Sequence, residues 1–224
     1  MLTAGKAVSA AHVAFMAGVT DREINRLVDE NVLPHALVWR DHGRRFAPLT
    51  APLADFYFQA SEELTRSARL YVIQVITERL ERRPDFDAFL ELNEGVLGAD
   101  FDWSVRHRFW TVALRDCLEA AFRRAERMQA AEQHIVEDRE ILGGTPCFAG
   151  TRVPVANVVA AADEGVSVAE LQDAYPFLNE RLLEDARVYV KAHPRPGRPR
   201  RVADVDRSAV PVSRKVVRRA QGPA

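Results

Sequence analysis

The sequence has few cysteines and no long uninterrupted hydrophobic run. Cys117 and Cys147 have no metal-ligand partner at short spacing, so we expect reduced, packed thiols rather than a disulfide or a zinc site. No apolar stretch approaches the roughly 20 residues that a membrane span needs, and the N-terminus lacks a basic segment followed by an apolar stretch, so we expect neither a membrane span nor a signal peptide. These absences predict a cytoplasmic protein that does not associate with a membrane.

The sequence also lacks the motifs of an enzyme. The turn at 143–146 has glycines but not the lysine of a phosphate-binding P-loop, and Cys147 has only Arg152 as an electropositive neighbour. The histidines are scattered, without a pair that would lie on one helix face: His12, His35, His42, His107, His134 and His193. We therefore expect no catalytic residue, no bound metal and no cofactor.

The net charge of −1 is distributed unevenly along the chain. Residues 193–224, the basic tail, carry nine Lys and Arg against two Asp, together with several prolines and no aromatic residue. Such a segment cannot bury enough apolar surface to offset its ordering entropy, so it should be disordered alone and should bind an acidic surface. The residues expected to bind a partner are Arg195, Arg198, Arg200, Arg201, Arg214 and Lys215.

Residues 1–52 have the pattern of a winged helix-turn-helix domain. Residues 10–17 are apolar at helical spacing and end at Gly18, and Thr20 with Glu23 forms a capping box that begins a second helix. Residues 37–40 and 44–46 then read as two strands joined by a glycine-containing turn. This order of elements predicts a recognition helix followed by a wing.

The second helix and the wing carry hydrogen-bonding and cationic side chains of the kind that contact base edges and phosphates. Asn25 and Arg26 are the expected base readers, and Arg44 and Arg45 the expected phosphate contacts. The full set of expected DNA-binding residues is Thr20, Arg22, Asn25, Arg26, Arg40, Arg44 and Arg45, with His42 in the same wing. The alternative is that these are ordinary solvated residues on a helix and a turn.

Residues 53–134 are expected to form a helical linker and dimerisation region with one short hairpin. Helices are predicted over 53–60 and 61–83, a hairpin around 93–95, and a long helix over 103–132. The second helix should bury Leu64, Ala68, Tyr71, Val72, Val75 and Ile76. The long helix has an apolar seam that would pair with a second copy or pack within the chain: Leu114, Leu118, Ala121, Ala125 and Met128.

Residues 135–192 repeat the pattern of turn and helix-capping residues seen in residues 1–52. A short strand-like segment precedes a helix after Pro154, a capping box joins Ser167 to Glu170, and Asn179 caps a helix over 180–191. The whole chain is thus expected to be mainly α with small β-hairpins (α+β), ending in a hairpin and a three-helix unit. Residues 155–192 hold seven acidic against three basic side chains, which favours protein contact over DNA binding. The alternative is that residues 155–192 also bind DNA, with their acidic side chains facing away from it.

The C-terminal motifs resemble a known family. The segments 135–146, 150–155, 165–167, 175–178 and 193–200 look like the domain of unknown function 433. Cys147, Phe148 and the run 177–179 depart from its usual pattern. The arrangement of this domain after an N-terminal helix-turn-helix resembles the VapB-like antitoxins, whose partners are PIN-like ribonuclease toxins.

The resemblance implies a type II antitoxin that masks its toxin and binds its own operator DNA as a repressor. Two roles are open for the basic tail. It could neutralise the acidic metal site of the toxin. Alternatively, its Gly-Arg-Pro segment resembles the core of an AT-hook, which lies in an AT-rich minor groove. A homodimer is expected, since helix-turn-helix repressors gain affinity from paired half-sites. A regulator without any toxin is the rival interpretation.

Removal of residues 193–224 separates the two roles of the basic tail. We expect the truncated chain to lose toxin neutralisation and to keep operator affinity, measured by a ribonuclease assay and a gel shift. Surviving neutralisation with weakened operator binding would instead favour the minor-groove role.

Overall fold

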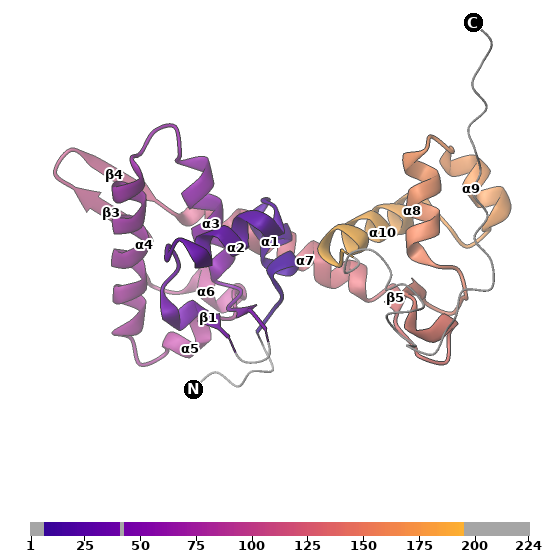
Figure 1. Cartoon of the computed structure of the whole chain (residues 1–224), viewed down its shortest axis with the longest axis horizontal. Coiled ribbons are helices and arrows are strands. Elements are labelled where there is room, and N and C mark those ends of the chain that lie inside the picture. Colours follow the sequence, from indigo (N-terminus) through magenta and orange to yellow (C-terminus); the bar gives the residue numbers. More distant parts are fainter. Residues whose placement is uncertain (1–6, 41–42, 195–224) are drawn as a thin grey trace, which may run out of the picture. The chain divides into compact units, whose positions relative to one another are not determined.

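The computed structural model describes residues 7–40 and 43–194. This part of the chain is mainly helical and carries three two-stranded antiparallel hairpins, which confirms the expected α+β fold class (Figure 1). The residues of the basic tail that are expected to bind a partner, from Arg195 to Lys215, lie outside the described residues, as does His42. Their expected contacts stay predictions.

The first elements follow the expected order. Helix α1 (Ala10–Ala17) ends at Gly18, whose φ of 72° lies in the left-handed region that glycine adopts without a steric penalty. Thr20 and Glu23 form the predicted capping box at the start of α2 (Asp21–Asp29). After a short 3-10 turn, η2 (His35–Leu37), strands β1 (Val38–Trp39) and β2 (Arg45–Phe46) pair antiparallel.

The next two helices begin at other positions than expected. Helix α3 (Thr50–Gln59) includes Pro52 in its first turn, where a residue without an amide hydrogen costs no intrahelical bond. Helix α4 (Arg66–Glu81) begins at the Thr65 cap rather than at residue 61. The expected burial of Tyr71 was wrong, because Tyr71 is 44% exposed and α4 instead buries a face shifted by one residue: Val72, Ile73, Ile76, Thr77 and Leu80.

The predicted hairpin around 93–95 was also wrong. That segment forms two short helices, α5 (Phe86–Phe89) and α6 (Glu94–Gly98), and the Asn93 side chain caps α6 by accepting from the Val96 amide. The hairpin lies later, in strands β3 (Ser104–His107) and β4 (Trp110–Ala113), where a helix was expected. Alternating burial over 110–113 and the pairing of β4 with β3 outweigh the helical propensity of this short stretch.

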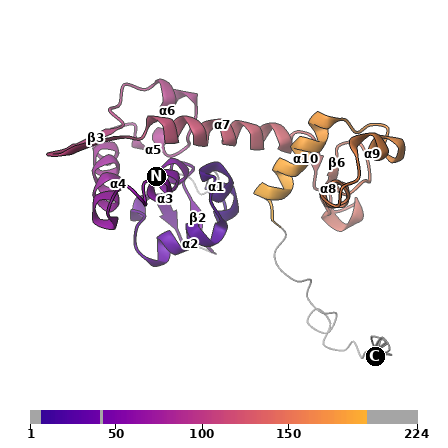
Figure 2. The same cartoon turned by 90° about the horizontal axis from the view of Figure 1, so that it is seen from above.

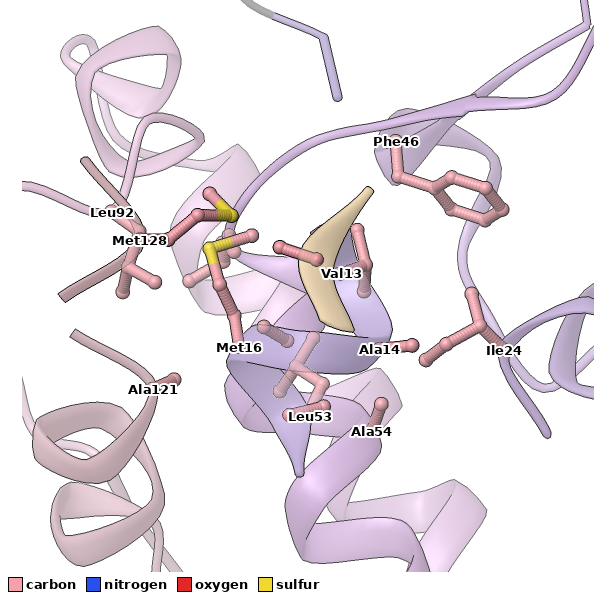
Figure 3. Packing of buried hydrophobic residues seen from close by; sticks show 14 of the residues in the cluster. Val13, Ala14, Met16, Ile24, Phe46, Leu53, Ala54, Leu92, Ala121 and Met128 are labelled. Atoms are coloured by element: carbon pink, nitrogen blue, oxygen red, sulfur yellow. The ribbon is translucent and has the colours of Figure 1, made fainter. Parts of the chain in front are cut away.

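Helix α7 (Arg115–Glu132) is the scaffold on which other helices pack. The expected seam is used within the chain, because α1, α3 and α10 (Glu180–Ala192) all lie against α7. Figure 2 shows α10 beside one end of α7, and Figure 3 shows Met16 of α1 and Met128 of α7 in one apolar cluster with Val13 and Leu53. Leu114 is the cap residue before this helix rather than part of it.

A buried ion pair joins three of these helices. Asp55 of α3 is only 2% exposed and accepts from Gln59, and Arg124 of α7 lies 3.4 Å from its carboxylate. Arg124 also donates to the main-chain oxygen of Met16 in α1 at 3.0 Å. Burial raises the pKa of Asp55, while Gln59 and Arg124 oppose that shift. A Cβ on Gly18 would meet the Arg124 guanidinium at 3.0 Å, so Gly18 provides space as well as the turn.

The last part of the described chain matches the expected helices closely. Strands β5 (Ile135–Val136) and β6 (Cys147–Phe148) pair around η3 (Leu142–Gly144). Helix α8 (Val155–Asp163) follows Pro154, α9 (Val168–Ala174) begins at the Ser167–Glu170 capping box, and Asn179 caps α10. Helix α10 packs against both α8 and α7, which joins this three-helix unit to the scaffold helix.

The two thiols are free, as expected. Cys147 is buried, and burial raises the pKa of the half-buried Cys117 to about 11, with the nearby Asp55 and Asp116 adding to the shift. A raised pKa disfavours the thiolate that nucleophilic chemistry needs. No helix in the described ranges is both long and apolar enough to cross a membrane.

Arg124→Met tests the buried ion pair. Asp55 would lose its cation while remaining buried, so we expect the free energy of unfolding to fall by about 2–3 kcal/mol, less than for a fully enclosed pair since Arg124 is one-third exposed. Urea denaturation measures the change. Arg123→Met, at an exposed position of the same helix, is the control and should shift stability by less than about 0.5 kcal/mol. Equal effects of the two substitutions would contradict the role of the pair.

Candidate nucleic-acid interface

Helix α2 presents its polar face to solvent because its apolar face is buried in the core. Ile24, Leu27 and Val28 are buried against neighbouring elements, which leaves Arg22 and Arg26 exposed one turn apart. Residues three and four positions apart share one side of a helix. The amphipathic pattern of α2 therefore places two guanidinium groups on one accessible face.

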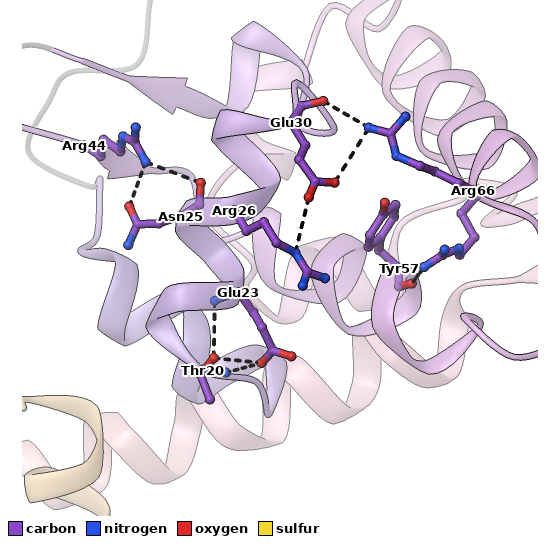
Figure 4. A network of polar contacts seen from close by, with 9 residues as sticks. Thr20, Glu23, Asn25, Arg26, Glu30, Arg44, Tyr57 and Arg66 are labelled. Carbon is purple, nitrogen blue, oxygen red and sulfur yellow. Dashed lines mark hydrogen bonds and ion pairs between the residues drawn. The ribbon is translucent and has the colours of Figure 1, made fainter.

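Arg44 connects the β1–β2 hairpin to this face. Its guanidinium donates to the Asn25 side-chain oxygen at 3.0 Å and to the Asn25 main-chain oxygen at 3.3 Å (Figure 4). It also pairs with Asp29 at 2.5 Å. Asn25 in turn donates to the main-chain oxygen of Asp21. The structure thus brings together Asn25 and Arg44, two of the predicted DNA-binding residues, and holds the hairpin against α2.

Glu30 joins two more arginines at the end of α2. Its carboxylate lies 3.5 Å from Arg26 and 3.7 Å from Arg66 of α4, and the Arg26 guanidinium lies over the Phe58 ring at 5.3 Å. Figure 4 shows Glu30 between the two arginines. Sequence reasoning missed Arg66 because no local pattern relates a residue at the start of α4 to one in α2. We call Arg22, Asn25, Arg26, Arg44 and Arg66 the α2 surface.

The other predicted residues have different roles or positions. The Thr20 hydroxyl is used by the capping box, where it accepts from the Glu23 amide and donates to the Glu23 carboxylate. Arg45 donates to the main-chain oxygen of Ala7 at 2.6 Å, a contact that fastens the first described residues to β2. Arg40 is exposed at the end of β1, beside two residues that lie outside the described ranges.

The ion pairs of the α2 surface are open to solvent. Arg26, Arg44 and Arg66 have side chains that are 38–55% exposed, and their carboxylate partners are 40–61% exposed. Exposed pairs of this kind contribute little to stability, so a phosphate group can replace a carboxylate partner at small cost. The carboxylates keep the guanidinium groups ordered but also lower the positive potential of the surface. Binding of a polyanion here would therefore depend strongly on salt.

A second basic feature was missed by sequence reasoning, which assigned it to a helix. The end of β3 and the turn that leads to β4 expose Arg106, His107, Arg108 and Phe109, and Phe109 is 80% exposed. The Arg108 guanidinium lies 4.9 Å from the centre of the Phe109 ring, and His107 stacks on Trp110. Alternation of apolar and polar residues over 110–112 was the available signal.

Three side chains from distant parts of the sequence meet near the start of α1. His12 of α1, Glu132 at the end of α7 and His193 after α10 place ligand atoms within 4.8 Å of one another. Sequence reasoning treated the histidines as unrelated, because their spacing carries no sign of this contact. Arg45 lies close enough to contribute to the lowered pKa of His12.

The surface of α8–α10 carries the acidic side chains that the sequence analysis assigned to protein contact. Arg187 pairs with Asp163 at 3.7 Å and Arg127 of α7 pairs with Glu184 at 2.8 Å. Glu164, Glu170, Asp173 and Glu180 remain exposed. The two capping-box turns, at Thr20 and at Ser167, therefore share local geometry and differ in charge.

Comparison with known proteins covers nearly the whole chain. The model of a protein family of unknown function, DUF433, matches residues 135–190, which confirms the resemblance noted for that region. The uncharacterized protein y4eO of Sinorhizobium fredii is 35% identical over 213 residues, which cover 95% of this chain and 93% of y4eO. The chain belongs to the family of y4eO. The similarity extends well beyond the DUF433 region, and no solved structure gives a significant match.

Separate substitutions of Arg45 and Arg22 by methionine test whether Arg45 stabilises the fold and Arg22 does not. Arg45→Met removes the hydrogen bond to Ala7 and should lower the free energy of unfolding by about 1 kcal/mol, measured in urea. Arg22→Met, on the exposed face of α2, should change it by less than about 0.5 kcal/mol. A larger loss for Arg22→Met than for Arg45→Met would contradict this assignment.

Proposed function

We propose that this protein is the antitoxin of a type II toxin–antitoxin system, which represses its own operon through the α2 surface and neutralises a PIN-like ribonuclease toxin. The observation that supports DNA binding most directly is the contact of Arg44 with Asn25, which fixes a basic hairpin beside a helix with exposed arginines. In this proposal α1 and α2 are the helix-turn-helix and β1–β2 is the wing.

The geometry of the turn supports this assignment of roles. Gly18 ends α1 and the capping box begins α2 within three residues, so the apolar faces of the two helices pack on each other. The outward face of α2 then presents Arg22 and Arg26, a side-chain type that reads guanine edges, while the Asn25 side-chain amide contacts Arg44 and Asp21. Arg40 and Arg44 of the wing and Arg66 of α4 are suited to phosphates on either side.

The DUF433 region is proposed to contact protein rather than DNA. Its exposed acids would repel phosphates, whereas they suit a partner with basic side chains. The order of a helix-turn-helix before a DUF433 domain resembles the VapB-like antitoxins, which is the reason for proposing a PIN-like toxin as the partner. The basic tail is proposed to reach the acidic active site of that toxin.

The second candidate function is a transcriptional regulator without a toxin. The same α2 surface supports it, because DNA binding does not require a toxin partner. Copurification with the product of the adjacent gene distinguishes the two functions: a stable complex that lacks ribonuclease activity supports the antitoxin, and DNA binding without any complex supports the regulator.

Arg26→Ala tests the proposed recognition surface. We expect it to weaken binding to the upstream promoter fragment by about tenfold or more, because it removes a base-reading guanidinium, while toxin neutralisation is unchanged. Gel shifts at fixed salt and a ribonuclease assay measure the two properties. Arg82→Ala is the matched control, since Arg82 is an exposed arginine at the C-terminal cap of α4 that pairs with a glutamate four residues away, as Arg26 does.

The outcome for the control decides the interpretation. Equal loss of promoter affinity in both variants would show that only overall charge matters and would remove the case for readout by α2. Loss of neutralisation in the Arg26 variant would place toxin contact on the same surface.

A further inference from the structure

Each of the two ring nitrogens of His193 faces an oxygen that accepts hydrogen bonds. His193 Nδ1 lies 3.1 Å from the main-chain oxygen of Tyr189, which can only accept, so Nδ1 carries a proton. The other ring nitrogen, Nε2, lies 3.2 Å from Glu132 Oε1. In a neutral ring this nitrogen bears a lone pair that faces a carboxylate oxygen. A cation is needed between the two atoms, either a proton on Nε2 or a metal ion.

His12 adds a third donor at the same point. Its ring contacts that of His193 edge to face, with centres 4.4 Å apart. A ring nitrogen of His12 lies within 4.8 Å of the ligand atoms of both His193 and Glu132, so three possible metal ligands converge here. A neutral imidazole is the form that binds metals.

We propose that His12, Glu132 and His193 form a binding site for a divalent transition metal, with Zn²⁺ as the expected ion. Two imidazoles and one carboxylate are a ligand set that suits zinc and leaves a fourth position for water. The ligand atoms lie within 4.8 Å of one another, so modest side-chain rotations bring them around one ion.

Surrounding groups hold His193 in the orientation that the site needs. The Tyr189 ring stacks on His193 with centres 4.2 Å apart, and the Tyr189 main-chain oxygen fixes the tautomer with the lone pair on Nε2. The Tyr189 hydroxyl donates to Glu137, which anchors the stacked ring. Hydrogen bonds of this kind orient metal-binding histidines and raise their affinity.

The three ligands come from three packed helices or their ends. Helices α1, α7 and α10 lie against one another, so the site depends on tertiary packing and a bound ion would fasten all three. Binding to the folded state alone raises its stability, which gives a readout that does not depend on DNA or toxin. The inference therefore stands or fails separately from the proposed function.

The experiment uses the full chain, without a histidine tag, stripped of metal by a chelator. ZnCl₂ is titrated calorimetrically at pH 7.5, and CoCl₂ is added in parallel to record the visible spectrum of a four-coordinate Co²⁺ site. We expect stoichiometric binding and a zinc-dependent rise in Tm. His12→Asn and Glu132→Gln should each weaken zinc binding by about tenfold or more. Circular dichroism checks that both variants keep the native helix content. His193→Asn is a third variant that removes a proposed ligand.

His134→Asn is the matched control. His134 also lies beside a carboxylate, with Nδ1 2.9 Å from Asp185, but it is outside the proposed site, so its loss should leave zinc affinity unchanged. Arg45→Gln removes a neighbouring positive charge and should strengthen binding. The proposal is overturned if zinc gives no stoichiometric binding, which would leave a proton between His193 and Glu132. It is equally overturned if folded His12→Asn and Glu132→Gln bind zinc as the natural chain does.

Discussion

The described structure depends on the packing of α1, α3 and α10 against α7. Helix α7 carries an apolar side against which α1, α3 and α10 pack, and the Asp55–Arg124 pair adds a polar contact in the middle of that packing. An unpaired carboxylate as buried as Asp55 would be costly, so Arg124 must stay in place. Arg124 also donates to the main-chain oxygen of Met16, and its guanidinium would lie 3.0 Å from a Cβ at position 18, so it packs closely against the end of α1.

The position of α2 has consequences for the chemistry of its surface. Arg26, Arg44 and Arg66 are paired with carboxylates that are themselves about half exposed, an arrangement that orders the guanidinium groups at little cost in stability. Ordered cations lose less entropy when they meet phosphates or bases. The same α1 that supports α2 also bears His12, so the proposed metal site and the proposed DNA surface share one structural element without sharing a residue.

Local signals in the sequence were sufficient where a residue's role depends on its immediate neighbours. The capping boxes at Thr20 and Ser167, the turn at Gly18 and the cap at Asn179 all act within about one helical turn, and each was placed correctly. The hairpin at 104–113 was missed because its short strands are also compatible with a helix, and only pairing between them decides. The exposed position of Tyr71 depended on which side of α4 faces the core, which β3 and α3 determine.

By itself the sequence determined the helices with clear caps, the order of helix, turn, helix and hairpin, and the DUF433 region, because hydrogen bonds and apolar spacing over a few residues are enough to fix them. Only tertiary structure decided the partners of the charged and titratable groups. Arg44 meets Asn25, Arg66 meets Glu30 and His12 meets His193 across separations of 19, 36 and 181 residues. Such contacts arise from packing of whole elements, and no local spacing encodes them.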